Sequence, residues 1–322
     1  MISMFVPSAA GRTEGKAFHV LDFSWDGFTP RLEAYDAEAG TAILLPLETL
    51  DMTVSEERIC IGSFDPEYRP CPTRRPVRRF AQCRSCAGDW AEVQECVFEP
   101  QCTGDSCPHG DFCGRRHVVY LAAYGTLVKV GMTSAGRLFR RGIEQGADAI
   151  VPVLLCRNRQ EARRLEKKTS ERLRLPQEIR VNRMAAQWTH PPSKDVIENS
   201  LATHRLRVAS WHEFVDEEVT HLDGYPVRAH PRSPPSVAAT AGHHAGVVLG
   251  VKGRYMIYRL PGGESRLLDL SDLPSRTVIL SQTWNDAPIS AMEARRPSWR
   301  QSPLDLCTRL DRSTLDSHGG RP

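Results

Sequence analysis

A phenol and an amine lie close together in the stretch HVVYLAAYGTLVKVGMT, residues 117–133, and both groups can take part in chemistry. Residues 118–123 and 127–132 are rich in β-branched and aromatic side chains, which predicts a β-hairpin. If Tyr124 and Gly125 form its turn, Tyr120 lies directly opposite Lys129. Cross-strand neighbours on one face have Cβ atoms about 5 Å apart. The sequence therefore predicts a candidate site built on Tyr120 and Lys129.

Eight of the ten cysteines lie between residues 60 and 113, in clusters such as CRSC and CVFEPQC. In a chain with no evident export signal, such clustering favours metal over disulfides. Thiolates are soft ligands that suit zinc, and eight of them can fill two closed, structural sites. Cys60 and Cys96 are also compatible with ordinary buried thiols, and His109 is an alternative ligand. We expect one zinc site at Cys60, Cys71, Cys83 and Cys86, and a second at Cys96, Cys102, Cys107 and Cys113.

The elements after the hairpin are expected to bring further charged groups beside it. Residues 137–145 have the apolar spacing of a short helix that Gly146 ends, and residues 149–156 form a third apolar strand. Asn158 followed by Glu161 is typical of a capping box, so a second helix should span residues 160–174. Glu166 borders the apolar stripe of that helix, where it can face the module or pair with a nearby Lys or Arg. The predicted order is β, β, α, β, α.

Positive charge is concentrated in this central module. Residues 114–174 hold fourteen Lys and Arg against five acids, a net charge of +9 in a chain whose total is +3, which leaves about −6 for the rest. A basic module inside a nearly neutral protein indicates a polyanionic partner, most simply nucleic acid. A solvated, Arg-rich helix without a partner is the alternative.

Both ends of the chain are expected to be rich in β structure. Runs at residues 18–23, 31–35 and 41–47 predict strands, as do four apolar runs between residues 247 and 280. The two ends have similar hairpin patterns, so we expect them to pair into one barrel-like domain. The predicted organisation is α+β: a β-rich segment at 1–59, a Cys-rich, zinc-ribbon-like segment at 60–116, an α/β module at 117–224, a linker with His243 and His244 at 225–246, a small β unit at 247–283 and a disordered tail at 284–322.

Taken together, the motifs resemble a known nuclease fold. VYLA at 119–122, KVGMT at 129–133, an arginine on the next helix and a glutamate on the one after it are similar to the GIY-YIG fold. The cysteine series followed by HVVYLA, KVGMT and RGIEQGA more narrowly resembles an uncharacterised microbial family, domain of unknown function 2797, thought to belong to that superfamily. The resemblance covers residues 60–175 strongly and extends weakly towards the C-terminus.

The resemblance implies roles for individual residues. In GIY-YIG nucleases hairpin tyrosines help to activate water, an arginine steadies the scissile phosphate and a glutamate holds one divalent ion, Mg²⁺ or Mn²⁺. These roles fall to Tyr120, to Arg141 or its neighbour Arg140, and to Glu166. A nearby cation can lower the pKa of the phenol, and a guanidinium matches phosphoryl oxygens.

Two positions depart from the nuclease pattern. Lys129 stands where the second tyrosine is expected, so it either shares in the chemistry or contacts phosphate, and Gln145 stands where such nucleases often carry a histidine. Further candidate phosphate contacts are Thr133, Arg137 and Arg140.

Three function classes remain open from the sequence: a metal-dependent endonuclease, a zinc-containing protein that binds nucleic acid without cutting it, and a scaffold with no nucleic-acid role. The N-terminus has no basic segment followed by a long apolar run, and no stretch approaches the length of a membrane span. We therefore expect a cytoplasmic protein.

Overall fold

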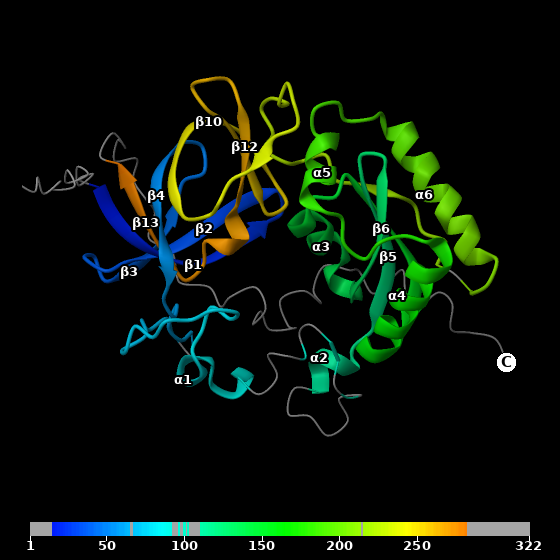
Figure 1. The fold of residues 1–322 in the computed structure, drawn as a ribbon. Helices are drawn as coiled ribbons and strands as arrows, with labels where there is room; N and C mark the ends of the chain where they lie inside the picture. Colours follow the sequence, from blue (N-terminus) through cyan, green and yellow to red (C-terminus); the bar gives the residue numbers. More distant parts are fainter. Residues whose placement is uncertain are drawn as a thin grey trace, which may run out of the picture.

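The computed structural model describes residues 15–64, 67–91, 96, 99–100, 102, 110–213 and 215–281. Two sheets lie side by side and form two lobes, with the Cys-rich segment against one end of them (Figure 1). Among the described residues, helices longer than one turn lie only in the lobe with the smaller sheet. The expected mixed α+β class is confirmed.

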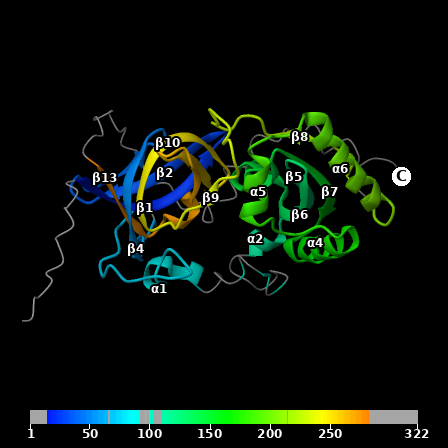
Figure 2. The same cartoon turned by 45° about the horizontal axis from the view of Figure 1, so that its top comes forward.

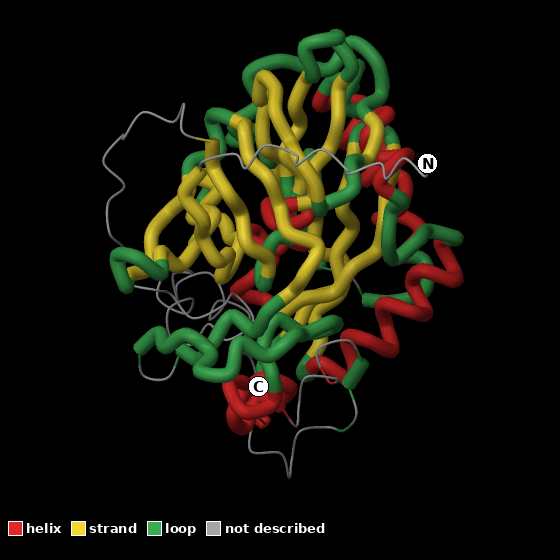
Figure 3. Tube along the Cα trace, turned by 60° about the vertical axis from the view of Figure 1, so that its left-hand side comes forward, coloured by secondary structure: helices red, strands yellow, loops and turns green. Residues whose placement is uncertain are grey.

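The larger sheet has nine strands and joins the two ends of the chain. Its strand order is β3-β2-β1-β13-β4-β10-β11-β12-β9, so β13 lies between β1 and β4, and β10 continues the sheet from β4. All neighbours are antiparallel except β12 and β9, and the sheet is strongly curved (Figure 3). The strands are β1 (Gly15–Asp26), β2 (Thr29–Asp36), β3 (Thr41–Leu45), β4 (Leu50–Arg58), β9 (Ser236–Val237), β10 (Gly242–Lys252), β11 (Tyr255–Arg259), β12 (Ser265–Asp269) and β13 (Arg276–Ser281).

Strand β10 begins inside the stretch that was expected to be a linker. His243 and His244 lie on this strand, not in a loop, and pair with Thr53 and Met52 of β4. His244 is buried, with Nδ1 3.1 Å from the Tyr258 hydroxyl and Nε2 3.0 Å from the Thr240 carbonyl oxygen. The sequence around these histidines is rich in small residues and therefore does not predict a strand. The strand forms because it pairs with β4, which is distant in sequence. The expected tail at 284–322 lies outside the described residues.

The smaller sheet has four strands in the order β6-β5-β7-β8. A hairpin, a helix, a third strand and a long helix follow one another as the sequence predicted. The elements are β5 (His117–Tyr124), β6 (Leu127–Ser134), α3 (Leu138–Gln145), β7 (Ala149–Cys156), α4 (Arg159–Leu173), α5 (Val181–Gln187), α6 (Lys194–Ala209) and β8 (Thr220–His221).

Local signals explain where the two main helices of this lobe end and begin. Gly146, with a φ of +76°, ends α3 in the left-handed conformation. Asn158 Oδ1 accepts a hydrogen bond from Glu161 N at 2.8 Å, and Glu161 Oε2 accepts one from Arg157 N at 2.7 Å. Asn158 therefore caps α4 as predicted, while Glu161 binds the amide one residue before the cap, so the arrangement is similar to a capping box.

The register of the hairpin differs from the expected one by two residues. Tyr124 pairs with Leu127, so the turn is Gly125–Thr126, and Gly125 has a φ of +58°. Tyr120 therefore lies opposite Gly131, and Lys129 lies opposite Ala122. Side chains alternate with a period of two, so a shift of two leaves Tyr120 and Lys129 on the same face. Their shared face was predicted correctly, but their direct pairing was wrong.

The two faces of the smaller sheet have different surroundings. Val119, Leu121 and Ala123 pack with the apolar side of α4 and α6, whereas Tyr120 and Tyr124 belong to a core shared with the larger sheet. The lobes lie next to each other across that second face (Figure 2). The face that carries the candidate site is thus covered by the β lobe.

Specific polar contacts fix the two lobes against each other. The turn between β10 and β11 meets the end of α3, where a Cβ on Gly253 would lie only 2.5 Å from Gly146 N. Lys252 forms an ion pair with Asp148, whose carboxylate also accepts a hydrogen bond from Gly125 N. The indole of Trp25 donates to the Gly253 carbonyl oxygen at 2.8 Å. These contacts hold the hairpin turn, α3 and the larger sheet in one arrangement.

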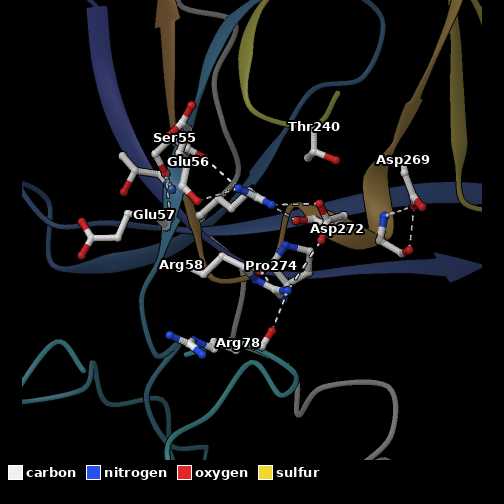
Figure 4. Close-up of polar contacts among 12 residues, drawn as sticks. Ser55, Glu56, Glu57, Arg58, Arg78, Thr240, Asp269, Asp272 and Pro274 are labelled. Atoms are coloured by element: carbon white, nitrogen blue, oxygen red, sulfur yellow. Dashed lines mark hydrogen bonds and ion pairs between the residues drawn. The ribbon is translucent and has the colours of Figure 1, made fainter. Parts of the chain in front are cut away.

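The Cys-rich segment contains α1 (Arg84–Ala87), η1 (Gly88–Ala91) and α2 (Gly110–Gly114) and is tied to the larger sheet by arginines. Arg58, at the end of β4, donates to the carbonyl oxygens of Arg78 at 2.9 Å and Pro274 at 3.4 Å (Figure 4). Arg276 donates to the carbonyl oxygens of Ser55 and Glu56, each at 2.9 Å. Both arginines pair with Asp272, at 3.6 Å and 2.9 Å respectively. Residues just before Cys60 are therefore anchored.

Candidate functional site

One face of the hairpin carries two tyrosines and a lysine. Tyr120 and Tyr124 of β5 lie on the same face as Lys129 and Gly131 of β6. The Lys129 ammonium lies 5.8 Å from the centroid of the Tyr124 ring, within the range of a cation–π contact. The sequence reading assigned Tyr124 to the turn and therefore missed it. Its alternation with Tyr120 along one strand is the signal that could have identified it.

Tyr120 is completely enclosed. Its hydroxyl donates a hydrogen bond to Gln145 Oε1 at 2.8 Å. Burial raises the pKa of Tyr120 to about 12, although the positive charge of Arg141 acts in the opposite direction. Arg141 acts on the phenol in the expected direction, but the desolvation caused by burial outweighs it, so the net change in the pKa is upward. At neutral pH the Tyr120 hydroxyl is protonated and acts as a hydrogen-bond donor.

Gly131 leaves room for the Tyr120 ring. A Cβ on Gly131 would lie 2.6 Å from both Cζ and Oη of Tyr120, inside the contact distance of real Cβ atoms. We expect Gly131→Ala to displace the ring and lower the free energy of unfolding by about 1–3 kcal/mol, the usual range for overpacking. Chemical denaturation measures this change. Gly262→Ala is the matched control, since no atom lies within 4 Å of its Cβ position. Equal stabilities of the two variants would contradict this role of Gly131.

Three arginines surround one carboxylate on and before α3. Glu144 lies 3.0 Å from Arg137, 2.9 Å from Arg140 and 3.5 Å from Arg141, measured between charged atoms. One negative charge shared by three positive ones leaves a local excess of +2. Arg137 and Arg140, both expected to contact phosphate, donate hydrogen bonds to the Glu144 carboxylate. Arg141 makes the longest of the three contacts.

A cavity of about 490 Å³ lies between the hairpin, α3 and the larger sheet. Arg141, Lys129 and Gln145 line it from the smaller lobe, and Trp25 and Tyr255 line it from the larger one. Although Arg141 lies between the lobes, 43% of its side-chain surface remains accessible, because it opens onto this cavity. The cavity brings together residues from both halves of the chain.

Lys129 is the most unusual residue in the lining. It is 7% exposed, and among the described residues it makes no hydrogen bond or ion pair. Burial and the positive charge of Arg141 lower its pKa to about 8, although Glu166 and Glu178 act in the opposite direction. Lys129 and Arg141 thus lie near each other, and the direct contact of the Lys129 ammonium found among the described residues is the Tyr124 ring.

Glu166 is buried near the site but does not line the cavity. Its carboxylate is 2.6 Å from the Arg163 guanidinium, which also donates to Gln177 Oε1 at 2.9 Å. Gln177 does line the cavity, so a short polar chain connects Glu166 to it. The negative charge of Glu166 also raises the pKa values of Tyr120 and Lys129. The structure therefore brings Tyr120, Lys129, Arg141 and Glu166 into one region, with Arg163 already paired to the proposed metal ligand.

Thr133 is buried on the hairpin face that carries Lys129, but it does not line the cavity. Its expected contact with phosphate stays a prediction.

Four cysteines form a compact ligand group. The Sγ atoms of Cys60, Cys71, Cys83 and Cys86 all lie within 4.8 Å of one another. Tetrahedral zinc with Zn–S bonds of about 2.3 Å separates its sulfurs by about 3.8 Å, so this set fits a zinc ion closely. Cys60 is therefore part of the group and not an ordinary buried thiol. The donor set and its spacing support the expected first zinc site, and a metal such as zinc can be held there.

Local structure around these sulfurs suits thiolates. Cys60 Sγ accepts hydrogen bonds from Cys83 N at 3.2 Å and Gly62 N at 3.4 Å. Cys83 caps α1, which places Cys86 on its first turn. Hydrogen bonds from backbone amides and from Thr73 lower the pKa of Cys71 to about 6 despite its burial, whereas burial raises the pKa of Cys60 to about 11. The amide donors offset part of the negative charge that four thiolates would carry.

The second expected zinc site is only partly described. Cys107 and the alternative ligand His109 lie outside the described residues. Burial raises the pKa of the Cys113 thiol, and the charges of Cys102 and Cys96 act on it in the same direction, which places the three near one another. They do not form a close ligand group among the described residues. Cys156 is buried in β7 as core, and Cys307 lies outside the described residues.

Comparison with known protein families identifies the family of this chain. A family model described as "Protein of unknown function (DUF2797)" matches residues 48–266, about two thirds of the chain. No curated protein and no solved structure matches. No helix within the described residues is long and apolar enough to span a membrane. The match begins just before the four-cysteine group, contains the whole smaller lobe and ends in β12, so the chain belongs to the DUF2797 family.

Proposed function

We propose that this protein binds nucleic acid through its phosphate groups, with a GIY-YIG-like module as the binding unit and Lys129 and Arg141 as the contacts inside the cavity. The observation that carries the proposal is Lys129, whose side chain is largely buried and lines a cavity beside Arg141 without an ion-pair partner among the described residues. Buried charges are normally paired. An anionic group between Lys129 and Arg141 would complete the pairing.

The outer face of α4 supports a polyanionic partner. Arg164, Lys167, Lys168 and Arg172 are exposed along this helix. Lys168 and Arg172 lie 5.2 Å and 4.9 Å from the Trp211 ring, which holds their positive charges in a fixed place on the surface. Lys167 is already paired with Glu99 at 2.8 Å, which leaves Arg164, Lys168 and Arg172 as the cations of this face. Such a row of cations suits the phosphate backbone of a nucleic acid, whose binding is then sensitive to salt.

Hydrolysis of a phosphodiester is a second candidate function, and the shared location of Tyr120, Arg141 and Glu166 favours it. The charges of Arg141 and Glu166 both act on the Tyr120 hydroxyl. A divalent ion at Glu166, Mg²⁺ or Mn²⁺, would supply Lewis acidity at a phosphoryl oxygen. Glu166 would have to exchange Arg163 for that ion, and a Tyr120 pKa of about 12 leaves almost no phenolate to act as a base at neutral pH. These two features favour binding over cleavage.

The cysteine groups complete the proposal as structural elements. Zinc at Cys60, Cys71, Cys83 and Cys86 would hold the Cys-rich segment in its position below the lobes. We extend the same role to Cys96, Cys102, Cys107 and Cys113, which would hold a second zinc ion beside α2.

One experiment separates the two functions. Purified protein is titrated with labelled single-stranded and duplex DNA and with RNA at several salt concentrations, and each mixture is then incubated with Mg²⁺ or Mn²⁺. Binding that weakens steeply with salt supports the proposal, and absence of binding at low salt overturns it. Cleavage that Glu166→Gln abolishes establishes hydrolysis. Cleavage unchanged in that variant would assign the chemistry elsewhere, and no cleavage leaves the binding function alone.

A further inference from the structure

The cavity has the size of a small ligand and walls from both lobes. At about 490 Å³ it falls within the usual range of small-molecule sites and cannot admit a duplex. Phe23 and Trp25 of β1 and Tyr255 of β11 form one wall, and the hairpin and α3 form the other. If the partner is nucleic acid, as proposed above, a cavity of this size takes about one nucleotide unit, either free or at the end of a strand.

The charge of the cavity favours a doubly charged anion. Lys129 has no anionic partner among the described residues, and Arg141 shares Glu144 with Arg137 and Arg140. The third cation of the lining, Arg254, is already paired with Asp269 at 2.8 Å. The carboxylate of Glu178 also lines the cavity and acts favourably on the Lys129 charge, so Lys129 and the three arginines around Glu144 leave an excess of about +2 after Glu178 is counted. A phosphodiester brings one negative charge, whereas a terminal phosphate monoester brings about −1.5 to −2 at neutral pH. The monoester matches the pair Lys129 and Arg141 more closely.

The rest of the lining suits the remainder of a nucleotide. Phe23 is partly exposed in this wall and offers aromatic surface to a base, a contact that depends little on base identity, while Trp25 and Tyr255 line the cavity but are largely buried. Gln177 and Ser24 offer polar atoms to a sugar or a base edge. Aromatic, polar and cationic groups thus occupy different walls of one cavity.

We propose that this cavity binds a nucleotide unit carrying a terminal phosphate monoester, with Lys129 and Arg141 on the phosphate and the aromatic wall of the larger sheet beside the base. This inference rests on the proposed function and narrows it, because it makes the end of a strand, or a free nucleotide, the group that is recognised. The exposed cations of α4 would then contact the backbone away from that end.

The test compares ligands that differ only in the phosphate. Isothermal titration calorimetry measures binding of adenosine 5′-monophosphate against adenosine, and of a single-stranded oligonucleotide with a 5′-phosphate, a 3′-phosphate or hydroxyl ends. We expect at least one phosphorylated end to bind about tenfold or more tightly than the hydroxyl strand. If the free nucleotide binds as tightly as the phosphorylated strand, the source is a nucleotide and not a strand end. Equal affinity for phosphorylated and hydroxyl ligands overturns the inference, while salt-sensitive binding of all strands would leave the proposed function standing.

Variants locate the preference in the cavity. Lys129→Gln and Arg141→Gln should each reduce the preference for the phosphorylated end to about that of a bare strand. Arg259→Gln, at an exposed position on β11 away from the cavity lining, is the matched control and should keep it. Circular dichroism and thermal unfolding identify any variant that fails to fold. If Lys129→Gln or Arg141→Gln does not fold, Lys129→Met is measured in its place. A full preference in folded Lys129 and Arg141 variants would overturn the inference.

Discussion

Replacing Cys83 with serine should remove the metal from the four-cysteine site and unfold the segment around it. Cys83 both contributes a sulfur and donates its amide to Cys60 Sγ, so the substitution weakens two parts of the cluster. Structural zinc sites contribute on the order of 10 kcal/mol to the folding of small loop-rich segments. Residues 59–87 have little regular structure apart from α1, so they depend on the metal more than the two lobes do.

Metal analysis and limited proteolysis measure the effect. Bound zinc should fall by one ion per chain, and cleavage within residues 59–87 should become rapid. Cys156→Ala serves as the control, because that thiol is buried in the core of the smaller lobe and lies outside the cluster. A wild-type protein without zinc, or a Cys83→Ser variant that retains its full metal content, would contradict the zinc site.

Lys129→Met should stabilise the fold while it removes phosphate binding. Burial lowers the pKa of Lys129 from 10.5 to about 8, so keeping its charge at neutral pH costs about 3 kcal/mol. The variant also loses the contact between the ammonium and the Tyr124 ring, worth about 1 kcal/mol. We expect the free energy of unfolding at pH 7 to rise by about 2 kcal/mol. A residue that lowers the stability of the fold, as we expect of Lys129, is typical of a binding site, where function is favoured over stability.

The increase in the free energy of unfolding caused by Lys129→Met should become smaller as the pH rises. Below pH 8 the lysine is protonated in both the folded and the unfolded chain, so the whole cost of burying the charge is present. Between pH 8 and pH 10.5 the unfolded chain binds more protons than the folded one, so wild-type stability rises with pH and the advantage of Lys129→Met disappears. Urea denaturation of both proteins at pH 7 and pH 10 measures the difference. A variant less stable than wild type at pH 7 would contradict this account of Lys129.

Features set by local signals were predictable from the sequence. The hairpin, α3, β7 and α4 follow from apolar periodicity, Gly146 and the capping pair Asn158 and Glu161. The first cysteine group also followed from the sequence, since its closest pair, Cys83 and Cys86, is only three residues apart. The prediction that Tyr120 and Lys129 share one face was correct although the predicted register was wrong, because the register error was an even number of residues.

Features that depend on distant segments were not predictable. Which residues turn the hairpin was decided by Gly125, whose positive φ and contact with Asp148 favour it as the first turn residue. The sequence did not show that the larger sheet covers the hairpin face, because Trp25 and Tyr255 lie more than 90 residues away from it along the chain. The sequence also did not show whether Glu166 would hold a metal ion or pair with Arg163, because either role is possible at its position on α4.

The central claim, that a phosphate group of nucleic acid lies between Lys129 and Arg141, is tested most directly by the pKa of Lys129 itself. NMR of protein with ¹³C-labelled lysine follows the Cε signal during a pH titration, and the Lys129→Met variant identifies that signal by its absence. Without ligand the signal should titrate at about pH 8. With a saturating 5′-phosphorylated oligonucleotide the pKa should rise towards 10.5, because the phosphate favours the charged amine. An unchanged pKa at saturation would show that the phosphate binds elsewhere, and the account of this cavity would be wrong.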